Sequence, residues 1–170
     1  MAKENTKPAG SGDADGIGAE SSADREIVIT RLIDAPRELV FRAFTDPKQV
    51  GKWWGPTGFT TTTHEMNVKP GGAWRFIMHG PDGTDWDNEI LYHEVVKPER
   101  LVYDHGEPGK PGQFKVWVTF DDAGGKTRLT MRSLFETAAA RDFVVKEVKA
   151  IDGGNQTLDR LEAHLAALRP

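Results

Sequence analysis

Cysteine is absent from this chain of 170 residues. Its absence excludes disulfide bonds, thiolate metal sites and cysteine nucleophiles, and is usual for a protein of the reducing cytoplasm. Long apolar runs are missing too, since none approaches the roughly 20 residues that span a bilayer. The first residues also lack the apolar stretch typical of a secretory signal. We therefore predict a cytoplasmic protein with no membrane among its partners.

An excess of positive charge is likewise missing. The formal net charge is −4 at pH 7, and Lys and Arg are scattered, so no segment is suited to binding a phosphate backbone. Nucleic acid is therefore not expected as a partner. The length, with 38% hydrophobic and 28% charged residues, is typical of one globular domain with one core.

Large apolar side chains are scarce in residues 1–25, where Ile17 is the only large aliphatic residue among Gly, Ser, Ala, Asp and Glu. Such a segment buries too little apolar area to offset the entropy lost on ordering. We predict a disordered N-terminal tail over residues 1–25 and one folded domain over residues 26–170.

Two prolines mark helix starts after a first strand. The run EIVITRLI, residues 26–33, is rich in β-branched residues and predicts a strand. Pro36 suits the first turn of a helix, and apolar residues come after it at helical spacing. The pair Asp46-Pro47 repeats this arrangement, and Gly55-Pro56 ends the second helix. The sequence thus predicts two short helices between the first strand and the second.

Six further runs alternate polar and apolar residues and are separated by turn residues. They span residues 59–68, 73–79, 84–96, 100–104, 114–120 and 127–135. Connections of hairpin length between successive strands predict one antiparallel meander. The first strand, separated by the two helices, is expected to pair at an edge of that meander.

The last segment, residues 137–168, has the apolar period of a helix. Its stripe comprises Val144, Val148, Ile151, Leu158, Leu161, Leu165 and Leu168. Gly153-Gly154 lies inside this segment and indicates either a kink or a place where another group passes close to the backbone. The element order predicts an α+β fold: a curved antiparallel sheet wrapped around a long C-terminal helix. A strongly bent sheet cannot press flat on one helix, so we expect a cavity between them.

Five short sequence motifs, in addition, resemble those of a known family. They are 34–41 (DAPRELVF), 53–56 (WWGP), 70–76 (PGGAWRF), 98–102 (PERLV) and 155–161 (NQTLDRL). Together they resemble the START-like superfamily, also called SRPBCC, with its helix-grip, birch-pollen-allergen-like fold. The branch most similar to this chain is the C-terminal domain of the activator of the heat-shock protein 90 ATPase. The resemblance implies a cavity under the long helix that holds apolar molecules, although members include enzymes, carriers and co-chaperones.

The tandem tryptophans in KWWGP raise two alternatives. Adjacent helical residues point about 100° apart, so one of Trp53 and Trp54 can seal the core while the other lines the cavity entrance. Alternatively, both simply brace the short helices against the sheet. Strand alternation places Trp74, Phe76 and Met78 on the same face of one strand. It likewise places Val116 and Val118 on the same face of another strand. These side chains either pack the core or, near an open end, contact a ligand.

Histidine is the polar candidate for the cavity. His64 is predicted to share a strand face with Met66, so it is our first choice for a polar contact or a general base, the alternative being a surface position. No pair of histidines has a metal-ligand spacing and no nucleophile motif is present. We therefore predict no metal, no cofactor and no assigned catalytic residue. The predicted ligand-binding residues are Trp53, Trp54, His64, Met66, Trp74, Phe76, Met78, Val116, Val118, Met131, Gly153 and Gly154.

Three functions remain open on this reasoning. The first is the binding of a small apolar or aromatic molecule by a domain spanning residues 26–170. The second, implied by the resemblance, is a stand-alone co-chaperone that acts on a heat-shock chaperone in the stress response, with a filled interior. The third is a small-molecule hydrolase or cyclase, which requires a buried polar residue with a perturbed pKa. Either a monomer or a homodimer is compatible with the sequence.

Overall fold

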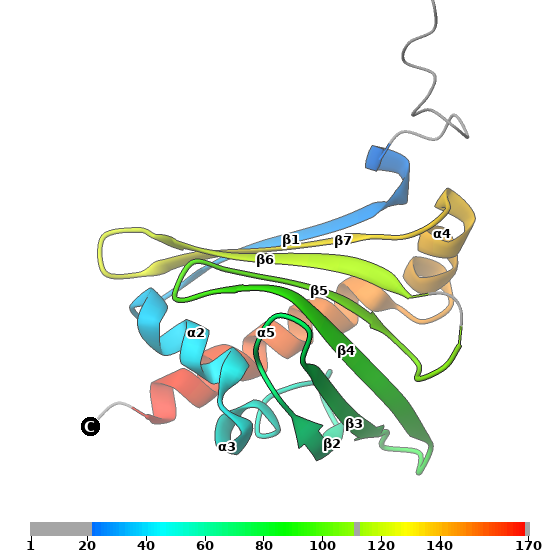
Figure 1. The fold of residues 1–170 in the computed structure, drawn as a ribbon, viewed down its shortest axis with the longest axis horizontal. Coiled ribbons are helices and arrows are strands. Elements are labelled where there is room, and N and C mark those ends of the chain that lie inside the picture. Colours follow the sequence, from blue (N-terminus) through cyan, green and yellow to red (C-terminus); the bar gives the residue numbers. More distant parts are fainter. Residues whose placement is uncertain (1–21, 111–112, 169–170) are drawn as a thin grey trace, which may run out of the picture.

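A computed structural model describes residues 22–110 and 113–168 and shows an α+β fold. The order of the elements is the predicted one, except that a short 3-10 helix precedes the first strand and the C-terminal helical segment is divided in two (Figure 1). The strands are β1 (Glu26–Ile33), β2 (Thr60–Met66), β3 (Ala73–His79), β4 (Asp85–Val96), β5 (Arg100–Gly106), β6 (Phe114–Asp122) and β7 (Thr127–Leu134). The helices are η2 (Ser22–Arg25), α2 (Arg37–Thr45), α3 (Pro47–Val50), α4 (Ala138–Lys146) and α5 (Ala150–Ala167).

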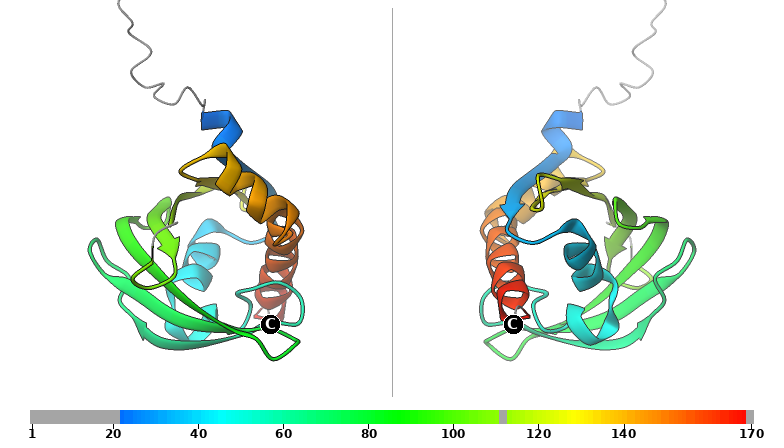
Figure 2. Two further views of the ribbon diagram at one scale, coloured as in Figure 1. Left: turned by 90° about the vertical axis from the view of Figure 1, so that its right-hand side faces the viewer. Right: turned by 90° about the vertical axis from the view of Figure 1, so that its left-hand side faces the viewer.

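All seven strands form one antiparallel sheet in the order β1-β7-β6-β5-β4-β3-β2. Strands β2 to β7 are the predicted meander, and β1 pairs with β7 at one edge, as expected. The sheet is strongly curved, and α2, α3 and α5 lie on its concave side (Figure 2). The predicted helix-grip fold is therefore confirmed.

The prolines act at the helix starts as the sequence indicates. Pro36 itself occupies the N-cap of α2, immediately before the first turn in which it was expected. Asp46 caps α3, since its side chain accepts a hydrogen bond of 2.9 Å from the backbone N–H of Lys48. Helix α3 ends at Val50, so the tandem tryptophans lie after it rather than on it, in residues 51–56, the tryptophan turn.

The C-terminal helical segment is interrupted, in contrast to the continuous helix expected from its apolar period. Helix α4 ends at Lys146 and α5 begins at Ala150. Lys149 between them has a left-handed backbone, with φ 59° and ψ 44°. The break therefore precedes Gly153-Gly154, and the glycine pair lies within α5. Of the two interpretations of that pair, close approach of another group is the one that holds.

The core fills one end of the space under the sheet. It joins α2, the tryptophan turn and the second half of α5 to the concave sheet face. Its largest fully buried side chains are Trp53, Trp74, Phe76, Phe120, Ile33, Ile90, Leu101, Leu129, Leu158, Leu161, Val40 and Val50. Residues of the predicted stripe nearer the start of α5 are exposed instead, for example Val148 and Ile151. Only half of the helix therefore packs on the core.

The N-terminal prediction falls mainly on residues 1–21, which lie outside the described residues. Ser22–Arg25, the end of the predicted tail, form the 3-10 helix η2. Arg25 is bonded to Phe135, because the Phe135 N–H donates to the Arg25 carbonyl at 2.9 Å and the Arg25 guanidinium donates to the Phe135 carbonyl at 3.0 Å. No helix in the described part of the chain is long and apolar enough to cross a membrane.

Candidate functional site

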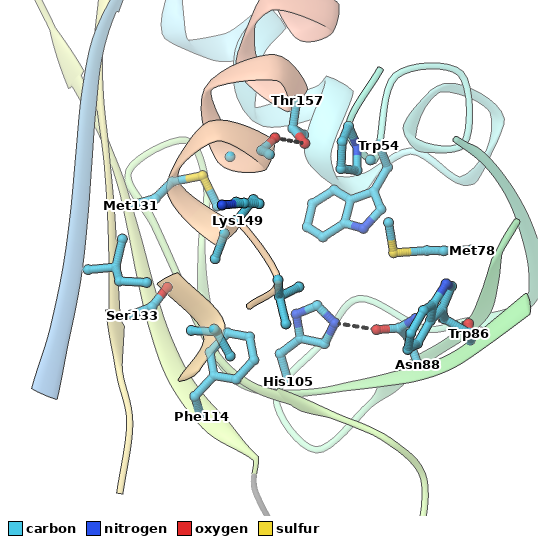
Figure 3. A pocket seen from close by; sticks show the side chains of 18 of the residues that line it. Trp54, Met78, Trp86, Asn88, His105, Phe114, Met131, Ser133, Lys149 and Thr157 are labelled. Carbon is cyan, nitrogen blue, oxygen red and sulfur yellow. Dashed lines mark hydrogen bonds between the residues drawn. The ribbon is translucent and has the colours of Figure 1, made fainter. Parts of the chain in front are cut away.

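A cavity of about 530 Å³ lies between the sheet and the first half of α5 (Figure 3). Its lining comes from β1, β3 to β7, the tryptophan turn, α4 and α5. Most lining side chains are apolar, among them Ile27, Ile29, Trp54, Met78, Phe114, Met131, Phe135, Val144 and Val148. The polar residues in the lining are Asn88, His105, Glu107, Ser133, Lys149 and Thr157. This volume is within the range of pockets that hold drug-sized molecules.

The glycine pair explains how α5 can form one wall. A Cβ atom on Gly154 would lie 2.6 Å from Cδ1 of Ile29 on β1. One on Gly153 would lie 3.3 Å from Cγ of Pro56 in the tryptophan turn. Because neither residue carries a side chain, β1 and the turn both approach the helix backbone closely. The cavity is thereby closed along this side without a side chain filling it.

Trp54 separates the cavity from the core. Its ring is 8% exposed and meets Trp74 edge-on, with the ring centroids 4.9 Å apart. Trp53 also borders the cavity but is only 1% exposed, and its indole N–H donates to the Ala43 carbonyl at 3.0 Å.

The tryptophan turn is held to α5 by Arg160, which donates to the carbonyl oxygens of Gly55 at 2.8 Å and Pro56 at 3.2 Å.

His105, at the end of β5, is the most unusual polar group in the lining. Its ring lies among aromatic rings, with centroid distances of 5.1 Å to Phe114 and 5.9 Å to Phe76. Its Nε2 lies 2.8 Å from Oδ1 of Asn88 on β4. Burial lowers the pKa of His105 to about 4, because the apolar surroundings disfavour the charged imidazolium. The imidazole is therefore neutral at physiological pH.

The mouth of the cavity carries exposed apolar and charged groups. Trp86 on β4 is 53% exposed and Val148 before α5 is 60% exposed, and both belong to the lining. Lys149 and Glu107 supply one charge of each sign. Glu107 forms an exposed ion pair with Lys110 at 3.7 Å. The entrance therefore presents large apolar side chains to solvent beside a small number of charges.

Comparison with known proteins identifies the family. The family model described as "Activator of Hsp90 ATPase homolog 1-like protein" matches residues 34–166. The chain belongs to this family. The matched range includes both short helices, strands β2 to β7 and nearly all of α5. A search of curated proteins found no match.

Several solved bacterial structures share the fold of this family member. A crystal structure from Nitrosomonas europaea superposes with a TM-score of 0.78 at 23% identity, covering 85% of this chain and 96% of that one. One from Mycobacterium smegmatis has a TM-score of 0.78 at 24% identity, covering 88% and 96%. One from Chromobacterium violaceum has a TM-score of 0.72 at 27% identity, covering 82% and 95%. These relatives support the helix-grip architecture.

Eleven of the twelve predicted site residues fall into three groups in this fold. Those in the cavity lining are Trp53, Trp54, Met78, Met131, Gly153 and Gly154. Those packed in the filled core are Trp74, Phe76, Val116 and Val118. Met66 is partly buried against that core. The alternation of the strands placed the core residues on the concave face as predicted, but these positions are at the filled end of the sheet.

His64 lies apart from the cavity. The pairing of β2 with β3 shifts between Thr63 and Glu65, so His64 is the extra residue of a bulge and is exposed. A bulge interrupts the alternation of faces, which is why the predicted common face with Met66 does not bring His64 inward. A second bulge lies between Tyr92 and Glu94 on β4. Glu94, which comes after this bulge, accepts a hydrogen bond of 2.8 Å from Arg100, whereas Glu89 accepts one of 2.6 Å from Arg75.

Sequence reasoning missed His105, Asn88 and Phe114 as cavity residues. A signal was present, because each continues an inward alternation toward the end of its strand. His105 comes after the buried Leu101 and Tyr103 at steps of two, and Asn88 precedes the buried Ile90 in the same way. These patterns do not show at which end of the sheet the core stops, because that depends on how the helices pack.

Among the described residues, no group of three His, Cys, Asp or Glu is placed to hold a metal ion.

Proposed function

We propose that this protein binds a small apolar or aromatic molecule in the cavity beneath α5. The observation that carries the proposal is an open space of about 530 Å³, bounded mainly by aliphatic and aromatic side chains. Transfer of apolar ligand surface from water into such a space contributes roughly 25 cal/mol per Å². Apolar burial would therefore supply most of the affinity, and the few polar groups would orient the ligand.

The first test is native mass spectrometry of the freshly purified protein, compared with its denatured mass. An additional mass that is released on denaturation supports the proposal and gives the chemical class of the ligand. A protein that carries no additional mass is then titrated with N-phenyl-1-naphthylamine, a neutral apolar probe whose fluorescence rises in an apolar site. Absence of binding in both experiments contradicts the proposal.

A pair of matched variants shows whether a bound probe occupies this cavity. Met131 points into it from β7, whereas Val28 on the neighbouring strand β1 is 52% exposed and lies outside the lining. We expect Met131→Trp to fill part of the space and weaken probe binding at least tenfold, and Val28→Trp to leave it unchanged. Equal affinity in both variants would place the probe elsewhere on the protein.

Regulation of a heat-shock chaperone is a second candidate, favoured by the description of the family that matches residues 34–166. A co-chaperone acting through its surface needs no internal space, and the open cavity is the opposite of the filled interior expected for it. Its test is the ATPase rate of the cognate chaperone with and without this protein. Stimulation that survives Met131→Trp supports a surface role independent of the cavity.

A hydrolase or cyclase is the third candidate, and the inward-facing, half-buried His105 is the lining residue that comes nearest to the buried polar group that this function requires. A base with a pKa of about 4 is weak at neutral pH, however. Among the described residues His105 has a neutral amide as its hydrogen-bond partner rather than a carboxylate. The arrangement is better suited to accepting a hydrogen bond than to removing a proton. Mass analysis of a bound ligand before and after incubation tests for turnover.

A further inference from the structure

We propose that the cavity selects apolar molecules that carry a hydroxyl or N–H group, whose hydrogen is accepted by Nδ1 of His105. This inference rests on the proposed binding function and names the chemical class of the ligand. It is based on one chain of hydrogen bonds that runs from the cavity mouth into its interior. The chain links the Trp86 carbonyl, the Asn88 amide and the His105 ring.

The hydrogen bonds determine the direction of each group. Nδ2 of Asn88 donates to the carbonyl oxygen of Trp86 at 3.0 Å. The Asn88 side chain therefore turns its oxygen toward His105, whose Nε2 lies 2.8 Å away. An amide oxygen can only accept, so Nε2 of His105 carries the hydrogen and donates it. Since a neutral imidazole has a single N–H, Nδ1 is left with a lone pair and no hydrogen.

This lone pair faces the cavity. In Figure 3 the nitrogen of His105 not bonded to Asn88 is directed into the interior, toward the space between Trp54 and Phe114. No described residue donates a hydrogen bond to it. The rings nearest to His105 are those of Phe114, Phe76 and Trp54, at centroid distances of 5.1, 5.9 and 6.4 Å. The charged groups of the lining, Lys149 and Glu107, are the ones at the mouth.

An apolar ligand without a donor would cover this lone pair and leave it unsatisfied. A buried acceptor that loses its water partner without gaining another weakens binding. A ligand whose hydroxyl or N–H lies near His105 restores that hydrogen bond while its apolar body contacts the aliphatic wall. Sites that hydrogen-bond a ligand hydroxyl discriminate strongly against the analogue that lacks it. The cavity therefore discriminates by one donor rather than by charge.

The test compares 2-naphthol with 2-methoxynaphthalene, which share the same two rings and oxygen but differ in the O–H donor. Dissociation constants are measured by calorimetry at pH 7.5 for the native protein, for His105→Phe and for His93→Phe. His93 is an exposed histidine on β4, bonded to Asp104 at 2.9 Å and outside the cavity. The same substitution there controls for loss of a histidine as such.

We expect the native protein and His93→Phe to bind 2-naphthol about tenfold more tightly than its methyl ether, the effect of one hydrogen bond. The ratio should fall toward one in His105→Phe. Equal binding of both probes by the native protein leaves the cavity function intact and overturns the donor requirement. A preference that persists in His105→Phe overturns it as well. Failure of both probes to bind a protein that binds N-phenyl-1-naphthylamine overturns this inference and leaves the proposed function intact, whereas failure of all three probes, with no co-purified mass, overturns both.

A measurement on the unmutated protein keeps the inference testable if His105→Phe does not fold. Long-range ¹H–¹⁵N NMR distinguishes the protonated from the unprotonated nitrogen of each imidazole ring. We expect Nδ1 of His105 to be the unprotonated nitrogen, and its resonance to move on addition of 2-naphthol but much less with 2-methoxynaphthalene. An unprotonated Nε2, or equal movement with both probes, overturns the inference.

Discussion

Nε1 of Trp53 donates a hydrogen bond of 3.0 Å to the carbonyl oxygen of Ala43 on α2. This bond anchors the tryptophan turn to the first helix within the core, where Ala43 is fully buried. Trp54, the next residue, instead contacts the aromatic cluster on β3 and the ring of His105. Both rings also contact Phe44, but of the two, Trp53 is the one hydrogen-bonded to α2 and Trp54 the one that reaches β3 and His105.

This difference predicts separate effects for the two tryptophans. Trp53→Phe leaves the Ala43 carbonyl without its donor and should lower the free energy of unfolding by about 1–3 kcal/mol. The same change at Trp54 should cost less stability and weaken binding of N-phenyl-1-naphthylamine more. Urea unfolding and a probe titration of both variants check this. Two variants with the same loss of stability and the same affinity would refute the division of roles.

The contact between Gly154 and Ile29 predicts a coupling between α5 and β1. Alanine in place of glycine within a helix gains about 1 kcal/mol, but at position 154 its Cβ would meet Cδ1 of Ile29 at 2.6 Å. Valine at position 29 lacks that atom. We therefore expect Gly154→Ala to gain little in the native protein and about 1 kcal/mol in the Ile29→Val background. Additive effects in the unfolding free energies of the four proteins would contradict the close approach.

Arg31 on β1 predicts a measurable ion-pair contribution to the docking of α5. Its guanidinium contacts Asp159 at 2.6 Å and Glu162 at 3.2 Å, and donates to the Asn155 carbonyl at 3.2 Å. Lysine cannot form this forked arrangement, so Arg31→Lys should cost about 1–2 kcal/mol of stability.

The control for Arg31 is Arg128, an exposed arginine on β7 whose side chain has no ion pair with a described residue. Arg128→Lys should change the free energy of unfolding by less than about 0.5 kcal/mol. Because Asp159 is 68% exposed, part of the Arg31 effect should be lost in 0.5 M salt. An Arg31→Lys variant as stable as the control would show that the network contributes nothing.

The lowered pKa of His105 predicts acid sensitivity. The folded value of about 4 is below the value near 6.5 of an unfolded chain, so between these values the unfolded state binds the proton more readily. The free energy of unfolding should therefore fall as the pH drops from 6.5 toward 4, by about 2–3 kcal/mol at pH 4.5. Urea unfolding of the native protein and of His105→Gln at pH 7.5 and 4.5 measures this loss.

The variant should retain more of its stability at pH 4.5, because glutamine does not titrate. Glu26, whose pKa is lowered mainly by its hydrogen bond with Arg132, destabilises both proteins equally as the pH falls and so cancels in the comparison. Equal losses in the native protein and in His105→Gln would show that His105 is not kept neutral by burial.

Local patterns were sufficient to predict most of the architecture. Period-two alternation located the strands, and Pro36 and Asp46-Pro47 located the two short helices, because these signals act within a few residues of the chain. The bulge at His64 and the break before Ala150 were not predicted. A bulge depends on the pairing of β2 with β3, and the break lies at Lys149, a residue with no marked preference for a left-handed backbone.

The residues that line the cavity likewise include some that local patterns predicted and some that they did not. Met78, Met131 and the glycine pair were predicted because the methionines lie on apolar strand faces and glycine is unusual within a helical pattern. His105 and Asn88 were not predicted as cavity residues. They are far apart in the chain, and their hydrogen bond forms only because β4 and β5 are neighbours in the sheet.

The sequence by itself determined the strands, the two short helices, their order and the apolar faces that require burial. Only the tertiary structure decided where burial is complete. Leu158, Leu161 and Leu165 are buried in the core, whereas the first half of α5 approaches the edge strand β1 and has no side chain at Gly153 and Gly154 to fill the space beside it. The position of the cavity, and of the imidazole within it, is therefore set by the relative placement of segments far apart in the chain.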